Sequence, residues 1–170
     1  MKLSTRARYG LRMMVELARA LKKEKLVRLR QIAKITGLSE NYMAQLAMSL
    51  RSDGLLLGVS GKKGGYRLAR EPREISVKDI VQAVQGPIAL TDCTIHPELC
   101  LNAPFCEARM VWVLANYRLL EVFESLTLED MIDKDFIMNT RKKNPDMKLL
   151  NPDKVMATDS FIISCPASTD

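Results

Sequence analysis

The sequence predicts a mainly α-helical fold with one small β-hairpin and one long helix. Residues 29–50 contain two short helical patterns separated by a glycine turn. Residues 55–69 contain two strand-like stretches around a glycine-rich turn, and residues 105–126 keep helical apolar spacing throughout. This order of elements is typical of a winged helix-turn-helix domain with a small β wing, followed by a long dimerisation helix.

The 170 residues are enough for one compact unit with an appendage, and we divide them into four expected parts. The winged helix-turn-helix domain takes residues 1–86, the cysteine loop residues 87–104, the dimerisation helix with a short packing helix residues 105–132, and a flexible tail residues 133–170. The tail is expected to begin where the apolar periodicity gives way to Lys, Asn, Pro and Asp.

The first three helices are predicted from their caps and their apolar spacing. Ser4 or Thr5 can cap the first helix. Gly37 can adopt the left-handed conformation that ends the second helix, residues 29–36, and Ser39 can cap the third. The third helix is expected to bury one face, formed by Met43, Leu46, Ala47 and Leu50.

The later helices carry similar signals. Ser76 and Asp79 form a capping box for a fourth helix, and Ile75 and Ile80 are spaced as its hydrophobic staple. The long helix from about Phe105 has an apolar side that needs a partner, formed by Met110, Val113, Leu114, Tyr117 and Leu120. A last short helix is expected to follow Thr127.

The charge is distributed unevenly along the chain. Residues 1–80 carry 18 Lys/Arg against 7 Asp/Glu, whereas residues 81–170 carry 8 against 13, so the halves are +11 and −5. A basic half indicates a polyanionic partner, although a merely soluble basic surface explains the composition too. No stretch has the apolar length of a membrane span or a signal peptide, so we expect a cytoplasmic protein.

The helix-turn-helix and the hairpin provide the candidate DNA contacts. The third helix would enter the major groove with Ser39, Asn41 and Gln45 near its N-terminal end, and an amide such as Gln45 can pair with adenine. The turn of the hairpin would present Lys62 and Lys63 to the phosphate backbone. Each feature alone has an ordinary explanation, a solvated turn or surface polar residues, but their order favours DNA.

Four motifs resemble the Rrf2 (Rrf-two) family of transcription regulators. They are Leu3-Ser4-Thr5-Arg6-Ala7-Arg8-Tyr9-Gly10, Leu38-Ser39-Glu40-Asn41-Tyr42, Arg51-Ser52-Asp53-Gly54-Leu55 and Gly61-Lys62-Lys63-Gly64-Gly65-Tyr66. The resemblance covers roughly residues 1–132 and implies a homodimer, formed through the long helix, on a two-fold symmetric double-stranded DNA operator. Ser60 and Ala44 stand where relatives place a wing arginine and a recognition-helix glutamate, so the preferred DNA sequence is expected to differ.

Three cysteines lie close together after the fourth helix. Six residues separate Cys93 from Cys100, and five separate Cys100 from Cys106. Thiolates are soft ligands for iron-sulfur clusters or zinc, and the residues alone leave a structural zinc, a cluster and inert thiols open. Cys165 is the fourth cysteine and is expected to be incidental.

The family resemblance implies that the three cysteines hold an iron-sulfur cluster of two or four irons. Two departures concern the fourth ligand: Arg109 replaces a histidine, and Arg8 replaces an N-terminal aspartate, each of which serves in some members. The only histidine, His96, is the leading substitute, and the acidic candidates behind it are Asp92, Glu98 and Glu107.

The sequence therefore predicts a sequence-specific DNA-binding transcription regulator whose DNA affinity is controlled by an iron-sulfur cluster sensing redox state, iron or nitric oxide. The alternative is a winged-helix protein-interaction module with a structural zinc, or a metal-free thiol switch. An enzyme is not expected, because the chain has a single histidine, no nucleophile with its base and no phosphate-binding loop between a strand and a helix.

Overall fold

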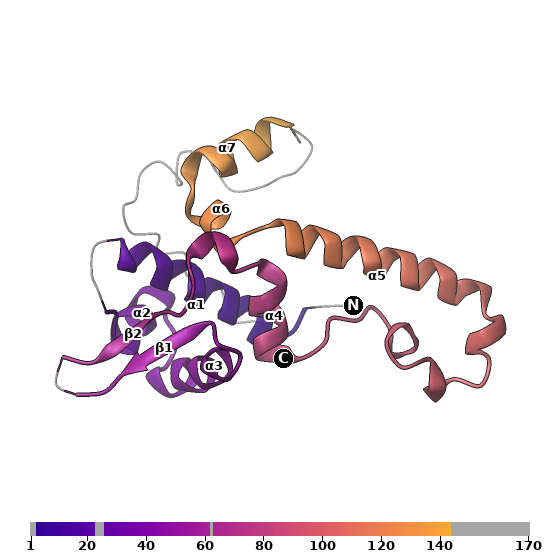
Figure 1. Cartoon of the computed structure of the whole chain (residues 1–170), viewed down its shortest axis with the longest axis horizontal. Helices are drawn as coiled ribbons and strands as arrows, with labels where there is room; N and C mark the ends of the chain where they lie inside the picture. Colours follow the sequence, from indigo (N-terminus) through magenta and orange to yellow (C-terminus); the bar gives the residue numbers. More distant parts are fainter. Residues whose placement is uncertain (1–2, 23–25, 62, 144–170) are drawn as a thin grey trace.

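The computed structural model describes residues 3–22, 26–61 and 63–143 (Figure 1). The α-helices are α1 (Thr5–Leu21), α2 (Leu29–Thr36), α3 (Glu40–Ser52), α4 (Val77–Gln85), α5 (Glu107–Ser125), α6 (Leu128–Ile132) and α7 (Lys134–Lys143), and the strands are β1 (Leu56–Val59) and β2 (Gly65–Leu68). Short 3₁₀ helices are η1 (Pro72–Glu74), η2 (Asp92–Thr94), η3 (Pro97–Leu99) and η4 (Ala103–Phe105). The mainly α fold with a small two-stranded sheet is the one predicted.

Hydroxyl caps begin the helices as expected. The Ser4 Oγ accepts a hydrogen bond from the backbone N–H of Ala7, and the Ser76 Oγ accepts one from Asp79, whose carboxylate accepts the Ser76 N–H in return. Such caps satisfy backbone donors that have no partner inside the helix. The predicted capping box of α4 is therefore confirmed.

The main core lies between α1, α2, α3 and α4. Its largest fully buried side chains are Met13, Met14, Leu17, Ile32, Met43, Leu46, Leu50, Leu55, Leu56, Ile75, Ile80 and Leu128. The buried face predicted for α3 is confirmed residue by residue. α1 packs closely on α4, because a Cβ at Gly10 would lie 2.9 Å from both methyl groups of Val84.

The hairpin is antiparallel and pairs Leu56 with Leu68 and Val59 with Gly65. A further bridge joins it to the segment before α2: the N–H of Val27 donates to the carbonyl of Tyr66 at 2.9 Å, and the N–H of Tyr66 donates back at 2.8 Å. The wing is therefore tied to the helix-turn-helix by two backbone hydrogen bonds.

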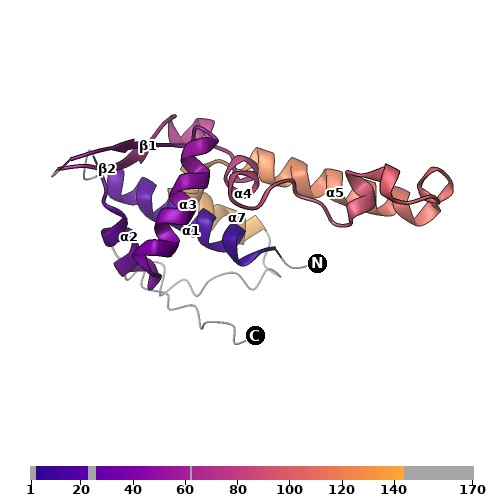
Figure 2. The same ribbon diagram turned by 90° about the horizontal axis from the view of Figure 1, so that it is seen from below.

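The loop after α4 leads the chain away from the winged domain, and α5 runs from the far end of that loop back to the domain, where α6 follows (Figures 1 and 2). The return is held where the N–H of Val77 donates to the carbonyl of Leu126 and the N–H of Leu128 donates to that of Ile75, both at 2.8 Å. α5 begins at Glu107, two residues later than Phe105, because residues 103–105 form η4 and Cys106 is extended.

The expected flexible tail needs a correction in its first part. Residues 134–143 form α7, which adjoins α6 (Figure 1). Apolar spacing is weak in this segment, so the sequence pattern did not reveal a helix. The rest of the expected tail, including Cys165, lies outside the described residues. Among the described helices, none is long and apolar enough to cross a membrane.

Candidate DNA-binding surface and cysteine loop

α2, its turn and α3 form the helix-turn-helix. Gly37 has a φ of +73°, a conformation that side chains other than glycine rarely adopt, and its N–H donates to the carbonyl of Ala33 at 2.9 Å. The Ser39 Oγ then accepts the N–H of Tyr42 at 3.2 Å and begins α3. Three residues, 37–39, connect the two helices, and α3 packs against α2.

The exposed face of α3 carries the predicted base-contacting side chains. Asn41 and Gln45 are exposed and four residues apart, which places them on one side of the helix. Ser39 is exposed as well, although its hydroxyl already caps the helix. Met48, three residues beyond Gln45, is 70% exposed and adds an apolar group to this face.

The wing presents its turn next to α2. Lys63 is exposed there, while Lys62 lies outside the described residues. The turn depends on glycine, because a Cβ at Gly64 would overlap the carbonyl oxygen of Val59. The predicted wing contacts are therefore located for Lys63 alone.

The cysteine loop is a chain of 3₁₀ turns between α4 and α5. Cys93 lies half-buried in η2, with its Sγ 3.3 Å from the Thr91 Oγ1. Cys100 follows η3 and is exposed, and Cys106 is the half-buried residue that precedes α5. All three are free thiols.

Three cysteine thiols are suitable ligands for an iron-sulfur cluster or a zinc ion, but the loop does not bring the three sulfurs together. Within residues 3–22, 26–61 and 63–143, no group of three His, Cys, Asp or Glu side chains is placed to hold a metal ion. His96 is exposed, and its Nδ1 lies 3.0 Å from the Glu98 Oε1. The pKa of the Glu98 carboxyl lies below its usual value, first because its own backbone N–H bonds to it and second because of His96.

α5 holds the loop through two side chains. The Arg109 Nε donates to the carbonyl of Cys93 at 2.9 Å. Asn116, the one buried residue of α5, accepts the N–H of Leu90 at 2.9 Å and donates to the carbonyl of Ile88 at 3.3 Å. α5 therefore binds the loop at two places, at Cys93 and at the segment that directly follows α4.

A family model named Rrf2 and described as an iron-dependent transcriptional regulator matches residues 3–134. The chain belongs to the Rrf2 family. It is therefore a transcriptional regulator and not an enzyme, as the motifs of the helix-turn-helix and wing predicted.

Curated Rrf2 relatives cover nearly all of this part of the chain. CymR of Bacillus subtilis is 38% identical over 131 residues, which cover 77% of this chain and 89% of CymR. NsrR of Halalkalibacterium halodurans is 31% identical over 136 residues, covering 79% and 92%. IscR of Aliivibrio salmonicida is 32% identical over 152 residues, covering 89% of each chain.

The solved structure of B. subtilis CymR, described as a global cysteine regulator, superimposes with a TM-score of 0.67 at 36% identity and covers 78% of this chain and 96% of CymR. This likeness supports the winged-helix architecture of the Rrf2 regulator. The family model is described as iron-dependent, whereas this solved relative is described as a cysteine regulator.

Two residues at the cysteine loop of this Rrf2 chain were missed by sequence reasoning. Asn116 is a polar residue on an apolar helix, and that contrast could have drawn attention to it. Arg109 was noted only as a missing histidine, and its hydrogen bond to the Cys93 carbonyl depends on how the loop folds back. A non-local contact of that kind leaves no local pattern.

Proposed function

We propose that this Rrf2 regulator binds a double-stranded DNA operator as a homodimer, and that an iron-sulfur cluster on Cys93, Cys100 and Cys106 controls its DNA affinity. One observation carries the proposal. The three cysteines occupy the segment that leads from the winged domain into α5, and hydrogen bonds from Arg109 and Asn116 hold that segment to α5.

The DNA contacts are assigned from exposure and chemistry. Asn41 and Gln45 would contact base edges in the major groove, and Ser39, at the N-terminus of α3, would approach a phosphate. Lys63, with its neighbour Lys62, would contact the backbone from the wing. Gln45→Ala is expected to relax sequence preference, whereas Lys63→Ala should weaken binding to every sequence.

The homodimer is proposed from the apolar surface of α5. Seven of its large apolar side chains are exposed in the single chain, namely Met110, Val111, Trp112, Val113, Leu114, Tyr117 and Val122. A helix with this surface requires a covering partner, and a second copy offers the same face. Leu114→Glu should produce a monomer in analytical ultracentrifugation, while Leu101→Glu, on the exposed loop, should leave the dimer intact.

The cluster is supported by the donor set and by the description of the family as iron-dependent. Cys93, Cys100 and Cys106 would hold it, after the loop brings their sulfurs together. When bound, the cluster supplies iron that responds to redox state and to nitric oxide. His96 remains the candidate for the fourth ligand. If it bound the cluster through Nδ1, it would have to give up its contact with the Glu98 carboxylate.

The chain's own residues would transmit the state of the loop. Arg109 binds the carbonyl of Cys93, and rearrangement of that cysteine alters or breaks this bond. Asn116 holds the segment leading back to α4. A coupling of about 1–3 kcal/mol between the loop and the DNA surface is enough for a switch.

The deciding experiment is an absorption spectrum of protein purified without oxygen, with iron, sulfide and zinc measured on the same sample. Visible bands with stoichiometric iron and sulfide are expected in the unmodified protein. Cys100→Ala should lose them, and Cys165→Ala, which also removes one thiol, should retain them. Retention of the bands in Cys100→Ala would refute the proposed ligand set.

A metal-free thiol switch is the second candidate. It is favoured by the separation of the three thiols in the described loop and by the likeness to the cysteine regulator CymR. It predicts colourless protein that takes up no cluster on reconstitution, and DNA affinity that changes on mild oxidation. Colourless protein with one zinc per chain would instead identify a structural zinc site.

A further inference from the structure

The exposed face of α3 carries an apolar residue to which no role has been assigned. Met48 is 70% exposed, whereas the apolar side chains on the opposite face of α3 are buried. Within residues 3–22, 26–61 and 63–86, no other large apolar side chain is more than 45% exposed. Met48 is therefore the most exposed large apolar side chain in the described part of the winged domain.

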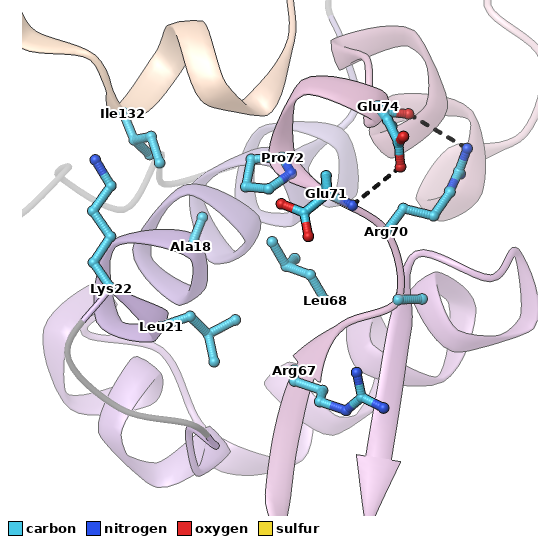
Figure 3. A pocket seen from close by; sticks show the side chains of 11 residues that line it. Ala18, Leu21, Lys22, Arg67, Leu68, Arg70, Glu71, Pro72, Glu74 and Ile132 are labelled. Carbon is cyan, nitrogen blue, oxygen red and sulfur yellow. Dashed lines mark hydrogen bonds between the residues drawn. The ribbon is translucent and has the colours of Figure 1, made fainter.

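Around the winged domain, other apolar side chains near the surface are better sheltered than Met48. Leu21, Leu68 and Ile132 line a hollow of about 550 Å³ between α1, β2, η1 and α6 (Figure 3), and each of them is half-buried. Met48 does not line this hollow, and most of its surface is in contact with water. Single exposed apolar residues are common on proteins, so the position of Met48 decides what its exposure means.

Met48 lies beside the two amides that were assigned to base contacts. Asn41 and Gln45 are four residues apart and form a polar row along α3. Ala44 and Met48 are also four residues apart and form an apolar row next to it. Helical side chains point toward the N-terminus of their helix, which directs the Met48 thioether toward Ala44 and Gln45. The outward face of α3 therefore presents amides and an apolar surface side by side.

The residues next to Met48 on the helix surface are held by other elements. The Arg6 Nη2 donates to the Ser49 Oγ at 3.1 Å and links this part of α3 to α1. On the other side of Met48, the Arg51 side chain lies against the wing, because a Cβ at Gly58 would be 3.5 Å from the Arg51 Nε. These contacts fix the position of α3 and leave Met48 uncovered between them.

The major groove of DNA offers groups that match both rows. An A·T base pair presents N6 and N7 of adenine, which an amide can bind through two hydrogen bonds, and the 5-methyl group of thymine, which is apolar. A G·C pair presents no methyl group there. With α3 in the major groove, the polar row meets adenine and the apolar row meets a thymine methyl group. The unbranched, flexible side chain of methionine adapts readily to such a contact.

We propose that Met48 determines sequence specificity by contacting the 5-methyl group of one thymine in each half of the operator. This inference rests on the proposed DNA-binding function and deepens it, because it names a base that α3 selects. Burial of one methyl group contributes about 0.8 kcal/mol, which corresponds to about fourfold in affinity. For a homodimer on two half-sites, the two contacts together amount to about fifteenfold.

The test removes only the methyl group from the DNA. Full-length protein enriches a duplex from random sequences, and each thymine position is then replaced by uracil, which pairs as thymine does but lacks the methyl group. Fluorescence anisotropy measures the affinity for each duplex. At one position, uracil should weaken binding of the unmodified protein about fourfold per half-site. Met48→Ala should bind the thymine and uracil duplexes equally, because the partner of the methyl group is gone.

Two further variants control for chemistry and for apolar surface in general. Met48→Leu keeps an apolar side chain of similar volume and should keep the preference for thymine over uracil. Leu101→Ala removes a side chain that is 98% exposed in the cysteine loop, and it should keep the preference as well. Both residues are exposed, so the variants should unfold at nearly the same urea concentration as the unmodified protein, which circular dichroism checks.

The outcomes distinguish the role of Met48 from the function on which it depends. If no thymine position responds to uracil, or if Met48→Ala keeps the preference, the role of Met48 is overturned, while the enriched duplex still establishes DNA binding. If Leu101→Ala loses the preference as Met48→Ala does, the effect is not particular to α3 and the role is again rejected. If the unmodified protein enriches no duplex, the proposed DNA-binding function fails together with the inference.

Discussion

Asn116 allows a direct test of how α5 holds the base of the cysteine loop. It is 6% exposed, and its amide makes both hydrogen bonds to the segment that follows α4, one to the Leu90 N–H and one to the Ile88 carbonyl. Asn116→Ala removes both bonds. It leaves the carbonyl of Ile88 buried without this donor and the half-buried N–H of Leu90 without this acceptor.

The expected cost follows from those two groups. A buried polar group left unsatisfied costs about 1–3 kcal/mol, and water can partly replace the partner of the half-buried N–H. We therefore expect a loss of about 2–4 kcal/mol in the free energy of unfolding. For a chain of this size, about 2–4 °C in melting temperature accompanies each kcal/mol, so the midpoint should fall by about 4–16 °C.

The assay is urea and thermal unfolding followed by circular dichroism at one fixed protein concentration, because dimerisation shifts apparent stability. Asn102→Ala, an exposed residue of the same loop, is the matched control and should change stability little. A loss for Asn116→Ala within about 0.5 kcal/mol of this control would refute the reasoning, since the amide would then contribute nothing that water does not replace.

The remaining predictions concern packing, capping and recognition. Gly10→Ala should destabilise by about 1 kcal/mol in urea unfolding, because crowding against Val84 exceeds the gain in helix propensity, and adding Val84→Ala should recover part of the loss. Ser76→Ala removes the cap of α4 and should cost about 0.5–2 kcal/mol, measured in the same way. Gln45→Ala should broaden the set of sequences enriched from a random library without altering the salt slope, and an unchanged set would contradict its assignment to base recognition.

The elements that the sequence predicted well are those with a strong local signal. α3 combines a serine cap, a strict apolar face and a following glycine, so its buried residues followed from spacing alone. α5 begins two residues late because Pro104 lies in a 3₁₀ turn that apolar spacing does not register. α7 was missed because residues 134–143 lack a clear apolar face.

In the candidate site, too, the features with a local sequence signal were predicted and those that depend on distant contacts were not. The cysteines and the polar face of α3 were predicted because their spacing is local. The bridge between Val27 and Tyr66, which ties the wing to the segment before α2, was not predicted, because the two residues are far apart in the sequence.

A short series of hydrogen bonds connects the cysteine loop with the proposed DNA-binding surface. Asn116 binds the segment that leaves α4, and at the end of α4 the Arg6 Nε donates to the Val84 carbonyl at 2.7 Å. The same guanidinium donates to the Ser49 Oγ of α3 at 3.1 Å. These hydrogen bonds connect α5, the end of α4 and α3, so a displacement at the base of the loop would, under the proposed control of DNA affinity, reach the proposed recognition helix through α4 and Arg6. The residues of α4 that face the core are buried, and packed helices move as units rather than deform, so such a displacement would shift α4 as a whole.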